Sequence, residues 1–148
     1  MDQKKALFYE MVSFITSVHQ TMYVMTKELP LGDVTPVQYG ILEYIAVSQP
    51  VTLSEISDCK HISMPNTSRE LKKLTDKGMC EKAEAEDDKR KQYIRLSSKG
   101  QQFMDAAFAH MEREFLGRIG SADGEELEQM RRAMVLLRTK VFDTDGAI

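Results

Sequence analysis

The segment Ser63–Leu74, SMPNTSRELKKL, combines short polar side chains with one guanidinium, where a solvated helix usually carries a mixture of Glu and Lys. Three positions recur at helical spacing and predict a core-facing side: Thr67, Leu71 and Leu74. The side chains between them, Asn66, Ser68 and Arg69, are then directed outward. An arginine can donate two hydrogen bonds to guanine, and an asparagine can pair with adenine. These residue types suit the base edges of DNA, although a solvated helix face is an equally good interpretation of this helix taken alone.

A shorter predicted helix lies before this segment. Thr52 and Glu55 form a capping-box pattern that opens a helix through about Lys60, and the turn HIS follows, without the glycine common in such turns. A short helix, a tight turn and a longer helix have the spacing of a helix-turn-helix, which presents the start of its second helix to the major groove. The predicted DNA contacts on that helix are Ser63, Met64, Pro65, Asn66, Ser68, Arg69, Lys72 and Lys73.

Two alternating segments come next, Met79–Glu86 and Lys91–Leu96, with the polar sequence DDKR between them. They predict a β-hairpin, and a hairpin directly after a helix-turn-helix makes a winged helix. A charged hairpin tip is most often only solvated. Here Asp88 lies two residues before Arg90, close enough to orient its guanidinium. The tip adds four predicted DNA contacts: Asp88, Lys89, Arg90 and Lys91.

Charge is distributed unevenly along the 148 residues, whose net charge is −3. The stretch Lys60–Lys99 holds eleven Lys/Arg against seven Asp/Glu, and the rest of the chain holds nine against sixteen. The basic central stretch is suited to binding a polyanion such as a nucleic acid, whereas the acidic ends of the chain are not.

Enzyme and membrane functions find no support in the sequence. The three histidines lie far apart, no glycine-rich phosphate loop is present, and the two cysteines, Cys59 and Cys80, match no metal spacing. No apolar run approaches a membrane span, and the N-terminus lacks the pattern of a signal peptide. We therefore predict a cytoplasmic, non-enzymatic protein without cofactor or metal.

The motif Asp88-x-Arg90-x-x-x-Ile94-x-Leu96-Ser97-x-x-Gly100 resembles the wing signature of the MarR family of multiple antibiotic resistance regulators. The sequences LKKLTDKGMCEK, VTPVQYGILEYIA and VTLSEIS are also similar to parts of that family. The resemblance implies a mainly α fold, a winged helix-turn-helix with a two-stranded β-wing and N- and C-terminal dimerisation helices. It also implies a homodimer that binds double-stranded DNA, most often a repressor released by a small ligand or an oxidant. It assigns groove reading to Asn66, Ser68 and Arg69, and the wing contact to Arg90.

The resemblance suggests one domain, 1–148, with a winged-helix core at 34–100 and dimerisation helices at 5–30 and 98–143. Apolar residues step by three and four through both flanking segments, as at a helical seam. Part of each stripe can equally belong to the intrachain core. The predicted dimerisation residues are Leu7, Met11, Leu127, Met130, Met134, Leu137 and Val141.

An effector site is the least constrained prediction. His19 and Tyr23 lie one turn apart on the first predicted helix, and Tyr39 lies near the start of the second. With flexible methionines nearby they could hold a small, partly aromatic ligand, or they are ordinary interior residues. Two alternatives to a ligand-released DNA-binding protein stay open: a winged-helix protein-interaction module without DNA binding, and a regulator that senses oxidants through Cys59 or Cys80.

Overall fold

The computed structural model describes residues 2–84 and 90–143 of the chain. It is mainly helical with one small antiparallel sheet, which confirms the predicted fold class. The elements are α1 (Gln3–Thr26), α2 (Pro36–Ser48), β1 (Val51–Thr52), α3 (Leu53–Lys60), α4 (Met64–Asp76), β2 (Cys80–Ala83), β3 (Tyr93–Leu96), α5 (Ser98–Arg118), α6 (Gly124–Leu137) and the π-helical η1 (Arg138–Phe142). They form two compact units, Met1–Met111 and Glu112–Ile148.

Side-chain caps fix where several helices begin. The Thr35 hydroxyl accepts a hydrogen bond from the Gln38 backbone N–H, and the Gln38 side chain accepts one from the Thr35 N–H, each at 3.2 Å. This reciprocal pair is a capping box, with Pro36 at the first helical position. At the start of α4, the Ser63 hydroxyl accepts from the Asn66 N–H at 3.3 Å. These bonds satisfy N–H groups that have no partner within the helix.

The turn between α3 and α4 is made without glycine. His61 adopts the left-handed conformation there, with φ of 55°. The hydroxyl of Ser57 donates to the Ile62 carbonyl oxygen, and the Ile62 N–H donates to the Ser57 carbonyl oxygen at 3.1 Å. The turn therefore closes on α3 through hydrogen bonds although it lacks the residue type most often found at such positions.

The sheet has one strand more than the two-stranded wing implied by the family resemblance. Its strand order is β1-β3-β2, with β3 in the centre and both neighbours antiparallel to it. Val51 of β1 pairs with Ile94 and is fully buried. A strand of two residues is too short to show alternation, so the sequence pattern gave no sign of it.

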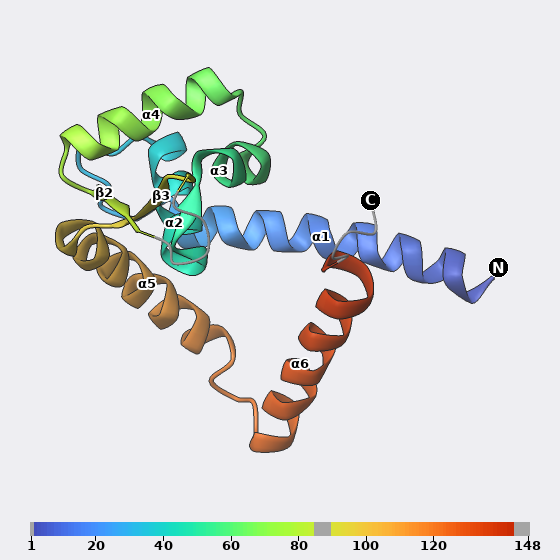
Figure 1. The fold of residues 1–148 in the computed structure, drawn as a ribbon. Helices are drawn as coiled ribbons and strands as arrows, with labels where there is room; N and C mark the ends of the chain where they lie inside the picture. The colour runs from blue at the N-terminus through green and yellow to red at the C-terminus, as the bar shows by residue number, and fades with distance from the viewer. Residues whose placement is uncertain (1, 85–89, 144–148) are drawn as a thin grey trace. The chain divides into compact units, whose positions relative to one another are not determined.

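The core of the first unit lies under α4, between α2, α3, the sheet and the start of α5 (Figure 1). Its fully buried side chains are Ile41, Leu42, Ile45, Val51, Ile56, Thr67, Leu74 and Met104. Among them, Thr67 and Leu74 come from α4, so burial fixes which side of that helix faces inward. Its opposite side is left to solvent.

A close backbone approach joins the end of α4 to the start of α5. A Cβ atom on Gly100 would lie 2.0 Å from the carbonyl oxygen of Met79, so only glycine fits there. The Ser97 N–H donates to that same carbonyl at 2.9 Å, and the Lys99 ammonium donates to the Lys77 carbonyl oxygen at 2.8 Å. The first turn of α5 is thereby attached to the loop that leaves α4.

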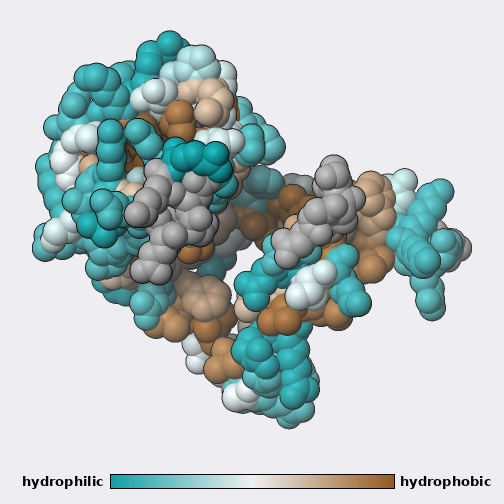
Figure 2. All heavy atoms as spheres, in the orientation of Figure 1, coloured by the Kyte–Doolittle hydropathy of each residue, from teal (hydrophilic) through white to brown (hydrophobic). Residues whose placement is uncertain are grey.

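Helices α1 and α6 differ from the core helices in exposing large apolar side chains. Figure 2 shows apolar atoms on the surface of each of these helices, whereas the winged helix is mostly polar outside. On α1 the exposed set is Leu7, Phe8, Tyr9, Val12, Phe14, Ile15, Val18, Met22 and Tyr23. On α6 and η1 it is Leu127, Met130, Met134, Val135, Leu136, Val141 and Phe142. Among residues 2–84 and 90–143, no helix is both long and apolar enough to cross a membrane.

Candidate nucleic-acid interface

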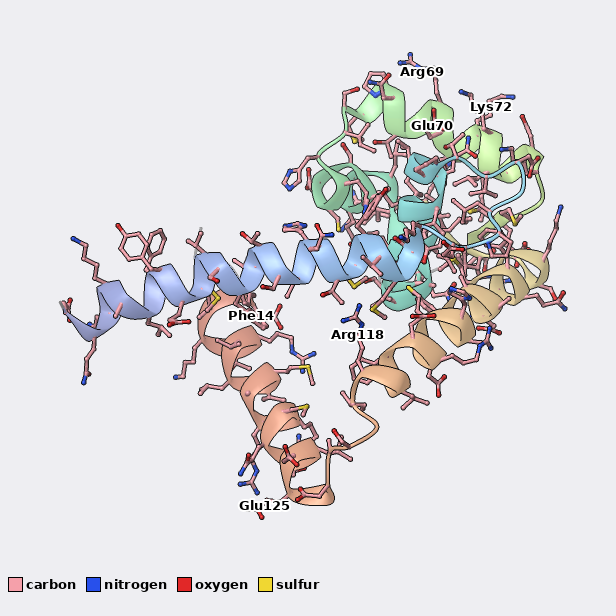
Figure 3. The ribbon with its side chains drawn as sticks, turned by 180° about the vertical axis from the view of Figure 1, so that it is seen from behind. Phe14, Arg69, Glu70, Lys72, Arg118 and Glu125 are labelled. Atoms are coloured by element: carbon pink, nitrogen blue, oxygen red, sulfur yellow. The ribbon has the colours of Figure 1, made fainter. Side chains whose placement is uncertain are left out.

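The exposed side of α4 collects most of the residues predicted to contact DNA. Thr67 is fully buried and its hydroxyl donates to the Ser63 carbonyl oxygen at 2.9 Å. Leu74 is also fully buried, and Leu71 packs partly against the core. The remaining side is exposed and consists of Ser63, Met64, Pro65, Asn66, Ser68, Arg69, Lys72 and Lys73. In Figure 3 the side chains of Arg69 and Lys72 project away from the body of the unit.

Two lysines in the second half of α4 are already paired with carboxylates. The Lys72 ammonium lies 3.2 Å from the Asp76 carboxylate, and the Lys73 ammonium lies 3.4 Å from Glu70. Both lysine side chains stay mostly exposed, at 78% and 60%. Exposed pairs of this kind are weak and screened by salt, so a phosphate can compete with the carboxylate for each ammonium.

The wing is described only in part. Arg90 and Lys91 are exposed just before β3, whereas the predicted contacts Asp88 and Lys89 lie outside the described residues, as does any orientation of Arg90 by Asp88. Further along the hairpin, Arg95 donates to the Glu81 carboxylate across the strands at 3.2 Å. A shallow depression of about 460 Å³ lies beside the wing and is lined by Thr52, Leu53, Ser54, Glu55, Lys91 and Gln92.

The three residues predicted for an effector site have different environments. His19 and Tyr23 are exposed on α1, whereas Tyr39 is 8% exposed and belongs to the core. The Tyr39 hydroxyl donates to the Glu43 carboxylate at 2.9 Å. Burial, and then the bond to Glu43, raises the pKa of Tyr39, so its phenol stays protonated. None of the three lines the depression beside the wing.

A polar network under α4 was not predicted from the sequence. It consists of Gln38 on α2, Glu70 on α4 and Lys77 just after α4, and we call it the α2–α4 network. The Gln38 amide donates to the Glu70 carboxylate at 3.0 Å, and the Lys77 ammonium donates to the Gln38 side-chain oxygen at 2.8 Å. Gln38 is 2% exposed. The bond from Gln38, followed by the nearby lysines, lowers the pKa of Glu70.

Cysteine and metal chemistry add little to this surface. Cys59 is exposed and Cys80 is buried, and burial raises the pKa of the Cys80 thiol to about 12. Within the described part of the chain, His, Cys, Asp and Glu side chains form no group of three or more that could hold a metal ion.

Comparison with known proteins finds a family match over the winged-helix part of the chain. The sequence profile of the MarR family matches residues 32–91, which include α2, α3, α4 and β2. Comparison with the curated proteins gives no match.

Solved structures resemble nearly the whole chain. A MarR family protein from Bacillus stearothermophilus has a TM-score of 0.73 and 18% identity, over 95% of this chain and 97% of its own. Staphylococcus aureus MarR, solved in complex with salicylate and kanamycin, has a TM-score of 0.69 and 21% identity, over 97% and 95%. Streptococcus pneumoniae FabT, solved in complex with DNA, has a TM-score of 0.65 and 20% identity, over 92% and 98%. At these identities the likeness concerns the fold.

Proposed function

Because the chain carries a MarR-family winged helix-turn-helix domain, we propose that it is a cytoplasmic repressor that binds an inverted-repeat operator as a homodimer. The family consists of transcription regulators and not of enzymes, in agreement with the prediction of a non-enzymatic protein. The inverted-repeat operator, the two-fold symmetry of the dimer and repression rather than activation are proposed in addition to the family's general role.

The observation that carries the proposal is the exposed first half of α4. Its N-terminus presents a guanidinium, an amide and hydroxyls on one side, while Thr67 and Leu74 hold the other side in the core. A helix held in this way can enter the major groove with its first turns toward the base edges. Arg69 would read guanine, Asn66 adenine, and the lysines further along would contact phosphate.

The exposed apolar faces of α1 and α6 support a homodimer. Soluble monomers rarely expose contiguous apolar patches of this kind. The simplest way to bury them is contact with the same helices of a second copy of the chain. All the predicted seam residues except Met11 and Leu137 are exposed, and those two are half-buried. A two-fold dimer presents two recognition helices, which calls for two half-sites in inverted orientation.

The DNA-binding proposal is tested by selection from random duplexes. The wild-type protein should retain a preferred sequence, and footprinting on that duplex should protect two inverted half-sites about one helical turn apart. If DNA is retained without any sequence preference, the protein has no specific operator. If no DNA is retained even at low salt, the alternative of a protein-interaction module without DNA binding is favoured. Protection of one asymmetric half-site would contradict the symmetric dimer.

The dimer itself is tested with a matched pair of substitutions on α6. Met134 is 61% exposed and lies on the apolar stripe, whereas Gln129 is exposed off that stripe. Met134→Asp should place a charge in the seam and dissociate the dimer in sedimentation experiments, because a buried unpaired charge is costly. Gln129→Asp should remain dimeric. A Met134→Asp protein that stays dimeric and binds DNA would exclude this stripe from the interface.

A small aromatic ligand is the proposed release signal. The support is the fold shared with Staphylococcus aureus MarR, solved with salicylate and kanamycin, and the exposed imidazole and phenol groups of His19 and Tyr23 on α1. A ligand that binds the non-operator conformation more tightly shifts the population toward it, and a coupling of about 1–3 kcal/mol is sufficient for regulation.

A panel of phenolic acids and peroxide, each added to the protein–operator complex, separates ligand release from oxidation. We expect a phenolic acid to release the wild-type protein and the Cys59→Ser/Cys80→Ser variant alike. Release by peroxide alone, abolished in that double variant, would identify a cysteine switch instead.

A further inference from the structure

The α2–α4 network joins the recognition helix to the core by directional bonds, in addition to its apolar packing. Gln38 and Glu70 are 32 residues apart, and Gln38 and Lys77 are 39 apart, so the network closes a long-range connection. The Lys77 ammonium also donates to the Asp33 carbonyl oxygen at 2.6 Å, which ties the loop before α2 into the same cluster. In Figure 3 Glu70 lies on the inner side of α4, opposite Arg69 and Lys72.

Chemistry fixes the orientation of the Gln38 amide. Its oxygen accepts from both the Lys77 ammonium and the Thr35 N–H, and its NH2 group donates to the Glu70 carboxylate. Turning the amide over would set its NH2 group against two donors and its oxygen against a carboxylate. Only one orientation satisfies every partner, and among the described residues no buried side-chain nitrogen or oxygen lacks a hydrogen bond.

Apolar packing and this network constrain α4 in different ways. Leu74 and Thr67 hold the helix against the core, but apolar contacts are non-directional and tolerate small rotations. A hydrogen bond is weakened when its angle departs from linearity, so the bond to Glu70 opposes rotation of α4 about its own axis. Glu70 directly follows Arg69 in α4. The direction in which the Glu70 side chain leaves the helix axis therefore also sets the direction of the Arg69 side chain.

We propose that Gln38 is a positioning residue for base reading: through Glu70 it fixes the rotation of α4 and so the direction in which Arg69 and Asn66 leave the helix. The proposal rests on the proposed DNA-binding function. It assigns to a buried glutamine outside the helix-turn-helix an effect on sequence discrimination rather than on affinity for DNA in general.

The test compares binding to two probes: the duplex that the wild-type protein retains from a random pool, and an unselected duplex of the same length. Gln38→Leu removes all three side-chain bonds of the amide, to Glu70, Lys77 and the Thr35 N–H. Affinity for the selected duplex should fall about tenfold, as for one mismatched base pair, while affinity for the unselected duplex stays within about twofold. The ratio of the two affinities is the readout, because a smaller fraction of folded protein lowers both affinities alike.

A capping variant controls for stability. Gln38 also belongs to the capping box of α2, so its loss destabilises that helix as well. Thr35→Ala removes the hydroxyl that accepts from the Gln38 N–H but leaves the bond between Gln38 and Glu70 in place. Thr35→Ala should lower the melting temperature and keep the wild-type affinity ratio. If Thr35→Ala lowers the ratio as much as Gln38→Leu does, helix stability explains the effect and the proposal fails.

Reversing the two side chains gives a rescue that does not depend on Gln38→Leu folding. Gln38→Glu sets two carboxylates against each other and should lower the affinity ratio. Adding Glu70→Gln restores a donor and an acceptor in the opposite order, keeps a residue suited to the capping box at position 38, and offers Lys77 a carboxylate. The double variant should recover the wild-type ratio, although freeing Lys73 from Glu70 strengthens binding to both probes.

Besides a lowered ratio for Thr35→Ala, three results would overturn the assignment: a wild-type ratio for Gln38→Leu, a wild-type ratio for Gln38→Glu, or no recovery in the double variant. Failure of the proposed function is seen separately. In that case the wild-type protein itself retains no preferred duplex, before any variant is compared.

Discussion

Lys72 offers the most direct measure of contact between α4 and the DNA backbone. Its side chain is 78% exposed and its only described partner is Asp76, one turn further along the helix, which is 65% exposed. An exposed pair at this spacing contributes about 0.3–0.5 kcal/mol to the free energy of unfolding. Lys72→Ala should therefore leave the folded protein almost unchanged while removing one positive charge from the proposed phosphate-binding side.

The expected effect follows from counterion release. A two-fold dimer loses two phosphate contacts, so the slope of log affinity against log salt should become about 1.8 less steep. Between about 50 and 200 mM salt, the wild-type protein should then lose about twelvefold more affinity than the variant does. The loss at low salt should be the same for the selected duplex and for an unselected one, because phosphates carry no sequence information.

Titrations at several salt concentrations measure this slope. Lys4→Ala is the control, since Lys4 is an exposed lysine on the first turn of α1 and should keep the wild-type slope. Asp76→Asn should strengthen binding to all sequences, because it releases Lys72 from its carboxylate. A wild-type slope for Lys72→Ala would show that this residue does not contact phosphate and that α4 lies differently on the duplex.

Three further predictions concern single side chains. Arg69→Ala should cost ~1–3 kcal/mol of binding free energy on the selected duplex and relax discrimination at one base pair per half-site; an equal loss on unselected DNA would contradict base reading. Arg90→Ala should weaken DNA binding without lowering the melting temperature, since Arg90 is exposed and outside the core; unchanged binding would mean that the wing does not reach the DNA. Because burial raises the pKa of Cys80 to about 12, its thiolate is scarce near neutral pH and increases as the pH rises. Alkylation at about pH 8, followed by mass spectrometry, should therefore modify the exposed Cys59 alone, and comparable labelling of Cys80 would show that the site opens.

Local patterns were sufficient to predict the helices and the exposed side of α4. The start of α3 was predicted from Thr52 and Glu55, three positions apart, and the Thr52 hydroxyl accepts from the Glu55 N–H at 3.1 Å in the structure. The outward side of α4 follows from the spacing of Thr67 and Leu74, which are buried as predicted. Such features are fixed by neighbours in sequence, so a single chain carries enough information for them.

Features that depend on distant partners were not predictable in the same way. The role of Gln38 under α4 was not predicted, because its bonds to Glu70 and Lys77 join parts of the chain that no local pattern connects. Tyr39 was considered for a ligand site by its residue type alone, and its burial depends on the packing of the core. The strand β1 exists because Val51 meets Ile94 across the sheet.

The contact between Gly100 and the Met79 carbonyl has a mechanical consequence. The Ser97 N–H donates to this carbonyl, and a Cβ atom at position 100 would lie 2.0 Å from it, so the loop after α4 and the first turn of α5 have little room to move closer. A larger side chain at position 100 would have to push this carbonyl aside, and with it the loop that leaves the helix proposed to enter the major groove.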